Sequence, residues 1–277
     1  MYKKYLVVAS KKDRAGINIT TALSQYKRNP VFLGMQPDKS GFDFYLCDEE
    51  IIRTENLDLN RINKYDFVIF ASKHQSEKKE KSLSIHAPGN WSENSFGGER
   101  GKVCRSSGLF QKQMFDVLNK FAKEHKLNEK YSVTMECTHH GPLINKPCVF
   151  IEVGSTEEEW NDRRACFVIA KTISKMIDDF EENPYREVAI GIGGPHYCPN
   201  FNKLQLNSNV AFSHVIPSYV LPLTEDMIKE AMEKTEEDVE FVVLDWKGIG
   251  NAEERQRIVE ILEKNYIRWK KTGEVGK

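Results

Sequence analysis

The sequence predicts an α/β fold in which a mixed or mostly parallel sheet is covered by helices on both faces. Short segments rich in β-forming residues alternate with longer segments of helical period along the chain, which is the pattern that builds such sheets. Hydrophobic residues make up 40% and charged residues 29% of the 277 positions, so the chain has ample material for a core. The longest apolar runs, such as 67–71 and 241–244, are the size of single strands, which excludes a membrane-spanning helix.

The expected elements follow this pattern in order. Eight strands are predicted where short runs of Val, Ile, Phe and Tyr are bounded by turn-forming or charged residues: residues 5–9, 43–47, 66–71, 132–137, 148–153, 187–192, 210–213 and 240–245. Five helices are predicted where apolar residues recur every three or four positions: residues 14–26, 107–124, 157–182, 224–234 and 252–269. The third helix starts in a Ser/Thr-x-x-Glu capping box, and the fifth opens with Asn251 and Glu254 in the same relation.

One segment, residues 73–108, has neither period and is rich in Lys, Glu, Ser, Gly and Asn. A loop of this length inside a compact domain is usually functional or disordered. We expect an irregular, mobile segment with a hinge at Gly97 and Gly98. Because strands on both sides of it fit one sheet, residues 1–277 are expected to form a single domain.

Two glycine-rich segments look like nucleotide-binding motifs, but neither fits. In residues 97–102 only three residues separate the glycines that a P-loop spaces by four. Residues 191–196 follow a predicted strand, yet Pro195 and Pro199 forbid the immediate helix of a dinucleotide-binding fold. The sequence therefore gives no support for a nucleotide cofactor.

The cysteines and the N-terminus indicate where the protein works. The six cysteines are widely spaced and form no CxxC pair, so we expect reduced, buried thiols rather than a disulfide framework or a structural zinc site. The short apolar run after Met1 is followed by charges and by no small-residue cleavage site. A cytoplasmic protein is therefore expected.

Histidines gather at the ends of predicted strands. Five of the seven lie in or just beyond such ends, namely His74, His139, His140, His196 and His214. The sixth, His86, lies in the irregular segment, and only His125, at a helix end, reads as a plain surface residue. Because ligands of open α/β sheets bind outside the carboxyl ends of the strands, we expect several of these histidines to converge there.

The densest cluster is ECTHHGP at 136–142. If the strand persists to His140, then Glu136, Thr138 and His140 share one face and His139 points to the other. A second carboxylate, Glu152, lies in an otherwise apolar strand, where it must be paired with a cation, protonated or linked to a metal. Histidine and carboxylate together can hold a divalent metal ion with one position open for water, although each residue taken alone is as readily a structural one.

At these residues the chain resembles the archaeal-type D-aminoacyl-tRNA deacylase family. The resemblance rests on five segments in the family's order, SKHQS (72–76), LSIHAPGNW (83–91), ECTHHGP (136–142), FIEVGS (150–155) and GGPHY (193–197). It implies a phosphorylase/hydrolase-like three-layer α/β/α sandwich in one domain. It also implies hydrolysis, with zinc as cofactor, of the ester between a D-amino acid and the 3′-terminal adenosine of tRNA, a reaction of translation quality control and D-amino acid detoxification.

Roles for individual residues follow as hypotheses. Glu136 or His140 would be the general base, and the backbone amides at Gly193 and Gly194 could stabilise the developing oxyanion. The remaining expected contacts fall into three groups: metal ligands His86, His139 and His196; substrate-binding histidines His74 and His214; and phosphate-binding cations Lys73, Arg100, Lys102 and Arg105.

Two other functions remain open on the sequence alone. One is a zinc-dependent peptidase or amidase that acts on small substrates, and the other is a non-catalytic protein that binds RNA ends. The net charge of −1 gives no general basic field, so the expected partner is the acceptor end of D-aminoacyl-tRNA rather than DNA or a membrane. The expected state is a monomer or a small homo-oligomer.

Overall fold

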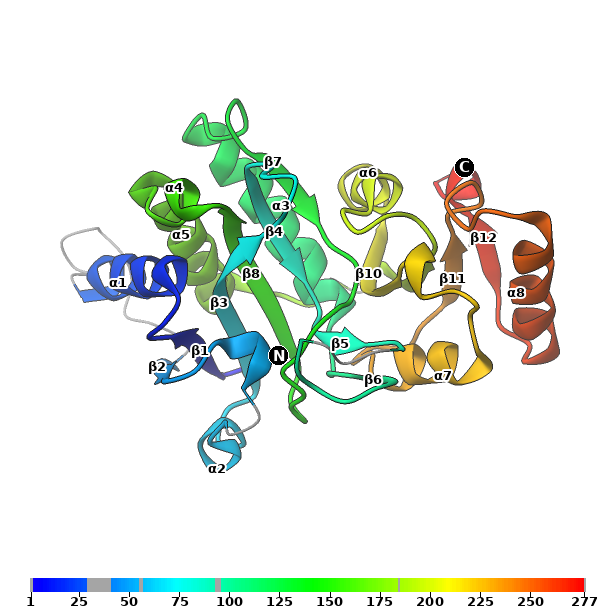
Figure 1. Cartoon of the computed structure of the whole chain (residues 1–277), viewed down its shortest axis with the longest axis horizontal. Coiled ribbons are helices and arrows are strands. Elements are labelled where there is room, and N and C mark those ends of the chain that lie inside the picture. The colour runs from blue at the N-terminus through cyan, green and yellow to red at the C-terminus, as the bar shows by residue number, and fades with distance from the viewer. Residues whose placement is uncertain (1, 29–40, 55–56, 93–95, 184, 277) are drawn as a thin grey trace.

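The computed structural model describes residues 2–28, 41–54, 57–92, 96–183 and 185–276. Its strands form a six-stranded sheet, a four-stranded sheet and a short two-stranded ribbon (Figure 1). Most strand pairs are parallel, so the α/β class with a mostly parallel, mixed arrangement is confirmed. The strands form two separate main sheets, however, where the sequence predicted one.

The six-stranded sheet has the order β2-β1-β3-β8-β4-β7. Its strands are β1 (Lys4–Ser10), β2 (Gly41–Cys47), β3 (Phe67–Gln75), β4 (Ser82–His86), β7 (Ser132–Met135) and β8 (Cys148–Ser155). Strands β2, β1, β3 and β8 run parallel to one another, whereas β4 is antiparallel to β8 and parallel to β7. The strand ends of this sheet therefore do not all meet at one edge.

The four-stranded sheet is wholly parallel and has the order β10-β9-β11-β12. Its strands are β9 (Glu187–Ile192), β10 (Val210–Ile216), β11 (Phe241–Leu244) and β12 (Trp269–Lys271). The antiparallel ribbon pairs β5 (Gly89–Asn90) with β6 (Lys102–Val103). The ribbon lies between the two sheets and close to α7 (Figure 1).

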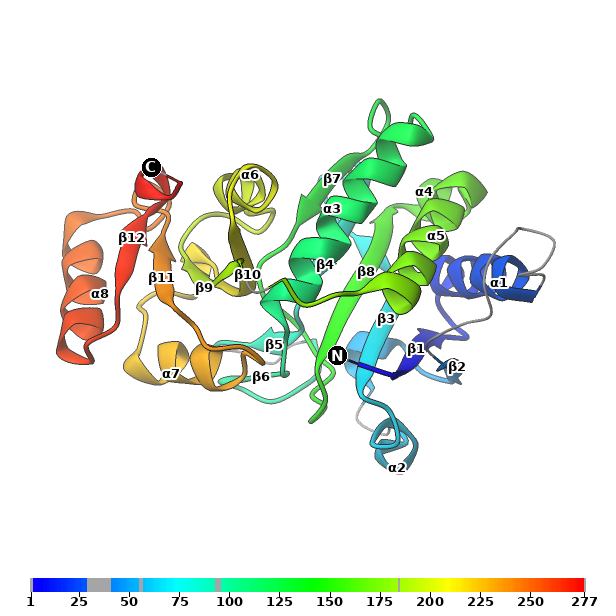
Figure 2. The same cartoon turned by 180° about the vertical axis from the view of Figure 1, so that it is seen from behind.

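Helices cover both faces and complete three layers (Figures 1 and 2). The helices are α1 (Arg14–Arg28), α2 (Leu59–Ile62), α3 (Gly108–Glu124), α4 (Glu157–Trp160), α5 (Arg163–Asp179), α6 (Pro199–Asn207), α7 (Glu225–Glu233) and α8 (Ala252–Lys264). Helices α1, α3, α5 and α6 pack on one face of the sheets in a continuous core. The opposite faces bury Ile62 of α2 under the six-stranded sheet and Ile228 of α7 and Ile258 of α8 under the four-stranded one. None of these helices, among the described residues, combines the length and apolar character that a bilayer span requires.

The two sheets are joined by the chain that follows β7. The backbone amides of Glu136, Cys137 and Thr138 donate in turn to the carbonyl oxygens of Ile85 (3.0 Å), His196 (2.9 Å) and Val215 (3.0 Å). The first acceptor belongs to β4, the second follows β9, and the third lies in β10. Three consecutive residues thus contact both sheets, and Figure 1 shows the two sheets side by side at this place.

The predicted elements agree with the structure except at specific capping and pairing sites. The expected helix 157–182 is two helices, because the Asp162 side chain accepts from the amides of Arg164 and Ala165 and starts α5. Pro199, taken to forbid a helix, is the first residue of α6, where a missing amide proton costs nothing. The expected helix 252–269 ends at Lys264, and Trp269 begins β12.

The stretch 73–108 is more regular than expected. Strand β4 lies inside it and is buried at every position because it pairs on both sides, with β8 and with β7. Both residues of β5 are buried as well. The expected hinge differs too: a Cβ on Gly97 would lie 2.0 Å from the Ile52 carbonyl oxygen, so this glycine is packed against the chain.

Thr138 offers a test of the junction between the sheets. Its hydroxyl accepts from the Val215 amide at 3.2 Å in a buried position, and Thr138→Val leaves that amide without a partner. We expect the free energy of unfolding to fall by about 1–3 kcal/mol in denaturant titrations. The matched change Thr172→Val removes only a hydroxyl that donates back to the Val168 carbonyl within α5. Equal losses in the two variants would show that the junction carries no special stability.

Candidate active site and metal centre

One face of the six-stranded sheet changes from apolar to polar along its strands. On β3, Val68 and Phe70 alternate onto the same face as His74, and on β8, Phe150 shares a face with Glu152. Registration of the two strands places Phe70 beside Phe150, with stacked rings 4.6 Å apart. The apolar end of this face is core, and its polar end carries the candidate site.

Two buried carboxylates anchor the polar end. The Glu152 carboxylate lies 3.4 Å from Nδ1 of His74 and 3.8 Å from Nε2 of His86 at the end of β4. Burial opposes ionisation of Glu152, but the two histidines outweigh it and lower the pKa of the carboxyl well below its usual range. Gly154 makes room for this arrangement, since a Cβ there would lie 2.6 Å from the Cβ of His74.

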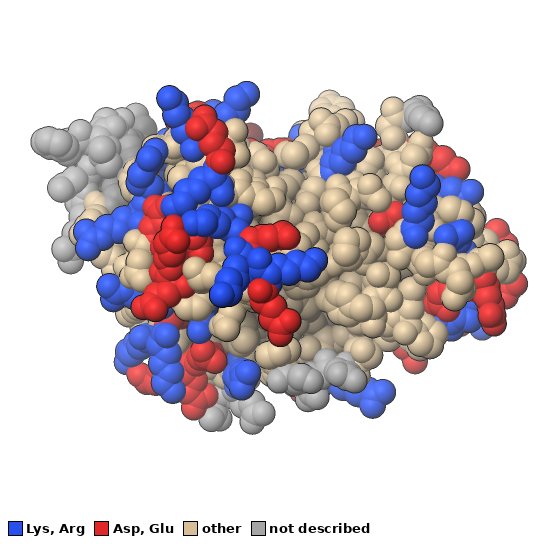
Figure 3. All heavy atoms as spheres, turned by 45° about the horizontal axis from the view of Figure 1, so that its top comes forward, with Lys and Arg blue, Asp and Glu red and all other residues tan. Residues whose placement is uncertain are grey.

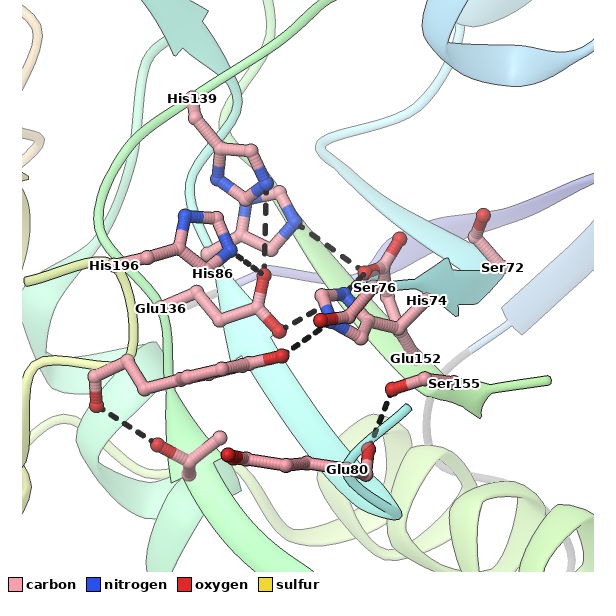
Figure 4. Close-up of polar contacts among 12 residues, drawn as sticks. Ser72, His74, Ser76, Glu80, His86, Glu136, His139, Glu152, Ser155 and His196 are labelled. Carbon is pink, nitrogen blue, oxygen red and sulfur yellow. Dashed lines mark hydrogen bonds and ion pairs between the residues drawn. The ribbon is translucent and has the colours of Figure 1, made fainter. Parts of the chain in front are cut away.

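Glu136 lies at the centre of the cluster and contacts three imidazoles (Figure 4). Its Oε1 is 3.2 Å from Nδ1 of His74, and its Oε2 is 3.2 Å from Nε2 of His196 and 3.5 Å from Nε2 of His139. Burial raises the pKa of Glu136, but His74 and His196 lower it by more than burial raises it, so the carboxyl group is ionised. A buried anion of this kind is stable only with cations around it.

Three further imidazoles are held in one tautomer by the backbone. Nδ1 of His86, His139 and His140 lies 3.1, 2.8 and 2.7 Å from the carbonyl oxygens of Ala87, Cys137 and Gly141. A carbonyl oxygen can only accept, so Nδ1 carries a proton in each of the three rings. In the neutral rings of His139 and His140 this leaves the lone pair at Nε2, whereas Glu152 outweighs burial and raises the pKa of His86. The rings are neighbours, with centroids 4.2 Å apart for His86 and His139 and 4.3 Å for His139 and His140.

The charges of these rings fit a bound cation. Burial and the neighbouring His86 lower the pKa of His139 well below its usual value, and the pKa of His140 falls to about 4 for the same reasons. Both rings are therefore neutral, and Nε2 of His139 faces the ionised Glu136. Nε2 of His86 is buried without a hydrogen-bond partner among the described atoms. The lone pair of His139 Nε2 lies 3.5 Å from the ionised Glu136, an arrangement that a cation between the two atoms would stabilise.

The donor set suits a divalent metal ion. Ligand atoms of His86, His139 and His140 lie within 4.8 Å of one another, and metal-bound histidines commonly donate their other N–H to a backbone carbonyl. Three imidazoles with one open position are a known catalytic arrangement for zinc. Three other groups of side chains also lie close enough: Cys137, His139 and His196; His74, Glu136 and His196; and His86, Glu136 and Glu152.

His196, predicted as a metal ligand, belongs to two of these groups and also lies in a chain of polar contacts. Its Nδ1 is 3.6 Å from the Cys137 sulfur and its Nε2 faces Glu136. Burial lowers the pKa of His196, but Cys137 and Glu136 outweigh burial and raise it to about 11. The Tyr219 hydroxyl lies 3.0 Å from the same sulfur. A protonated His196 between the Cys137 sulfur and Glu136 holds the Glu136 carboxylate in place.

A cleft with two lobes opens onto the histidines. The polar lobe, of about 730 Å³, is lined by residues that include Glu50, Arg53, Lys73, Lys79 and Trp160. The aromatic lobe, of about 440 Å³, is lined by residues that include Asn90, Trp91, Phe96, Tyr219 and Val220. His139, His140 and His196 line both lobes. A substrate that spans the cleft would therefore have its middle at the imidazoles.

Comparisons with known proteins identify the family of the chain. A sequence model described as D-aminoacyl-tRNA deacylase matches residues 61–270. The chain belongs to this family. It is 33% identical to the D-aminoacyl-tRNA deacylase of Methanocaldococcus jannaschii over 276 residues, which are 97% of this chain and 99% of that protein. It is 35% identical to the one from Pyrococcus furiosus over 270 residues, covering 92% of this chain and 95% of the relative.

A solved structure shares the whole fold. It is described as a conserved protein of unknown function, AF0625, and it superposes with a TM-score of 0.85 at 28% identity. The match covers 99% of this chain and 96% of the other. The family resemblance predicted from the five sequence segments is thus confirmed.

The prediction that Glu136, Thr138 and His140 share one face of a strand while His139 points to the other is wrong. Strand β7 ends at Met135, and His140 has a left-handed backbone with φ of 43°. The alternation of a strand therefore stops before the histidines. Both His139 and His140 lie beside His86, with ring centroids 4.2 and 4.8 Å away.

The predicted phosphate-binding cations separate into two kinds. Lys73 lines the polar lobe, pairs with Glu50 at 2.9 Å and lies over the Trp160 ring. Lys102 and Arg105 are tied to the acidic residues Glu230 and Glu236, away from both lobes. Arg100 is exposed and forms a backbone bridge to Asn90 of the aromatic lobe.

Three other predicted residues serve the scaffold. The Gly193 amide, expected to stabilise an oxyanion, donates to the Ile216 carbonyl at 2.8 Å. The Gly194 carbonyl accepts from Ser218, and its α-carbon packs against Gly248. His214 is fully buried, with Nδ1 3.2 Å from the Thr138 hydroxyl, and it lines neither lobe.

Sequence reasoning missed two of the site's polar groups. Cys137 was taken as an inert thiol, but the neighbouring Cys198 and His196 outweigh burial and lower its pKa to about 6. Tyr219 lies in a 3₁₀ turn after β10 and carries no local signal. Only its position in the fold brings its hydroxyl to Cys137 and its ring to the cleft.

The cation site can be tested by thermal unfolding. We expect added Zn²⁺ to raise the melting temperature, by the equivalent of about 2.7 kcal/mol when zinc is a hundredfold above its dissociation constant. His139→Ala should weaken zinc affinity tenfold or more in calorimetric titrations, whereas His125→Ala, at the C-terminus of α3, should leave it unchanged. Equal affinity in the parent and in His139→Ala would remove this residue from the site.

Proposed function

We propose that the protein hydrolyses the ester between a D-amino acid and the 3′-terminal adenosine of tRNA, and releases the free amino acid and tRNA. Membership of the deacylase family supports the reaction. The observation that carries the proposal for this chain is the cluster of His86, His139 and His140, in which His139 and His140 line both lobes of the cleft and Glu136 lies 3.5 Å from His139. Ester hydrolysis needs a base for water and positive charge for the oxyanion, and both are present there.

Glu136 is the proposed general base. It is ionised, His74 and His196 fix its position, and its Oε2 lies 3.5 Å from Nε2 of His139, a ring that lines both lobes of the cleft. The protonated His196 beside it stabilises negative charge as the ester carbonyl is attacked. His140, the other candidate for this role, fits better as a ligand because its lone pair converges with those of His86 and His139.

Zinc is the proposed metal, held by His86, His139 and His140. When bound, zinc supplies a Lewis acid that polarises the ester and favours ionisation of water. The residues of the chain keep the three rings oriented through their Nδ1 contacts to backbone carbonyls. The Glu152 carboxylate offsets positive charge at the centre, because it lies 3.4 Å from Nδ1 of His74 and 3.8 Å from Nε2 of His86.

The surface supports contact with the end of an RNA rather than with a long duplex. In Figure 3, Lys and Arg are interspersed with Asp and Glu on the side of the six-stranded sheet, and a broad uncharged surface lies over the middle of the molecule. Long duplexes are bound through extended basic surfaces. We therefore propose recognition of the acceptor end, in the cytoplasm where tRNA is charged.

His140 tests the chemistry. We expect His140→Ala and His140→Asn to lower turnover of D-aminoacyl-tRNA by at least about a hundredfold, because each removes an imidazole from the centre. The Asn variant tolerates the left-handed backbone at this position, so its loss of activity cannot come from backbone strain. His125→Ala is the control, and circular dichroism checks the fold. Parental turnover in either folded variant would exclude His140 from the mechanism.

Metal removal distinguishes the proposed reaction from the two other functions. We expect exhaustive chelation to abolish deacylation of D-aminoacyl-tRNA with a modest loss of stability, and zinc to restore it. A peptidase or amidase would hydrolyse small amides regardless of tRNA, and an RNA-end-binding protein would bind tRNA without hydrolysing it. Full deacylation by protein shown by elemental analysis to be metal-free would contradict the zinc assignment.

A further inference from the structure

The two lobes of the cleft differ in charge. The described residues that line the aromatic lobe include no Asp, Glu, Lys or Arg, and their titratable rings are the Tyr219 phenol and the histidines that this lobe shares with the other. The polar lobe carries both signs, with Arg53, Lys73 and Lys79 beside Glu50 and Glu77. An uncharged, flat group therefore suits the first lobe, and a group of variable charge suits the second.

From this difference we propose that the aromatic lobe binds the terminal adenine of the tRNA and that the polar lobe receives the aminoacyl group. The assignment rests on the proposed function and adds to it the direction in which the substrate lies. The ester, which joins the two parts, would lie at His139, His140 and His196, which line both lobes together with Phe96. Both lobes are within the size range of small-molecule sites.

Exposed aromatic rings support a base in the aromatic lobe. Phe96 and Tyr219 keep 52% and 59% of their surface accessible, although large rings elsewhere in the fold are mostly buried. Proteins bind unpaired bases by stacking them on such rings. Adenine is present at the 3′ end of every tRNA, so a fixed pocket can serve all substrates.

Unused polar groups in the same lobe match the edge of a purine. The Trp91 indole N–H is buried without a partner among the described atoms, and adenine ring nitrogens are acceptors. The Asn90 amide nitrogen donates to the Gly97 carbonyl at 2.6 Å, which leaves its carbonyl oxygen to accept from the exocyclic amino group of adenine. A hydrophobic amino-acid side chain would use neither group.

The polar lobe fits the other half of the substrate. An aminoacyl ester carries an α-ammonium group, for which Glu77 offers a carboxylate, whereas Glu50 is already paired with Lys73 at 2.9 Å. Its side chain differs between tRNAs and can be acidic, basic or neutral. A lobe that contains Arg53, Lys73 and Lys79 as well as these carboxylates can accept all three kinds.

The assignment also places the phosphate that precedes the adenosine. Arg100 is exposed, bridges to Asn90 of the aromatic lobe and has no ion pair among the described residues. Lys102 also pairs with Asn90 across the ribbon, but its ammonium forms an ion pair with Glu230 at 3.1 Å. The RNA chain would therefore leave the cleft past Arg100 and not past Lys102.

Replacing the Tyr219 ring tests the adenine site. We expect Tyr219→Leu to raise KM about tenfold for D-aminoacyl-tRNA and for D-aminoacyl-adenosine, equally for D-alanyl and D-tyrosyl esters, because stacking on the base is lost. Tyr219→Phe keeps the ring, so its KM stays near the parental value even where kcat changes through loss of the hydroxyl beside Cys137. Tyr266→Leu, at a ring 95% exposed beyond α8, is the matched control.

A rise in KM that occurs for D-tyrosyl but not for D-alanyl esters would overturn the assignment, because the lobe would then bind the amino-acid side chain. Unchanged KM in Tyr219→Leu would overturn it as well. Binding of AMP and CMP, followed by tryptophan fluorescence, separates this result from the reaction itself. If AMP binds more tightly than CMP and Tyr219→Leu loses that preference, while the parent hydrolyses no D-aminoacyl-tRNA, the adenine site stands and the proposed function falls.

The exit of the RNA is tested by two neighbouring cations. We expect Arg100→Ala to raise KM for charged tRNA, to reduce the slope of log KM against log salt concentration by about one, and to leave D-aminoacyl-adenosine unaffected. Lys102→Ala should do neither, because its ammonium is already paired. Equal effects of the two substitutions, or an effect of Lys102→Ala alone, would overturn the proposed path.

Discussion

The site depends on three consecutive backbone hydrogen bonds. Glu136, Cys137 and Thr138 donate to β4, to the turn after β9 and to β10, and so fix the two sheets against each other. The same residues carry the Glu136 carboxylate and the Cys137 thiol to opposite sides of His196. Because side chains on this segment take their direction from backbone bonds to both sheets, catalytic geometry and the packing of the sheets cannot vary independently.

Charge balance is the second constraint. Glu136 and Glu152 are each 2% exposed, and an unpaired buried carboxylate would be strongly destabilising. Five imidazoles surround them, and backbone carbonyls select the tautomer of three. The neutral rings and the protonated His196 take different roles because their neighbours differ, although all are the same residue type. The cluster thus brings together groups of side chains that could hold a metal ion.

Local pattern predicted most of the elements because each buries one face or stripe. The apolar runs of β1, β3, β8 and β9 and the stripe of α5 report burial directly through their period. The errors come where long-range contacts outweigh local composition. β4 lies in a polar stretch yet is buried because β7 and β8 pair with it. Apolar residues recur at helical spacing on both sides of Asp162, yet its side chain caps the start of α5 and separates this helix from α4.

The sequence by itself determined the fold class, the family and the residue types of the site, including Glu136, His86, His139 and His140. The fold class follows from hydrophobic periodicity, and the family and the site residues follow from short motifs. Tertiary structure decided which of them meet. β4 and β7 run against the other strands of their sheet, so His86 and His74 reach Glu152 from opposite ends. Gly193 and His214 lie in the scaffold instead. The Gly193 amide donates to Ile216 of β10, and the His214 ring contacts Thr138 at the junction of the sheets. Contacts between residues that lie far apart in the sequence are set by how the elements pack, so local hydrophobic periodicity cannot predict them.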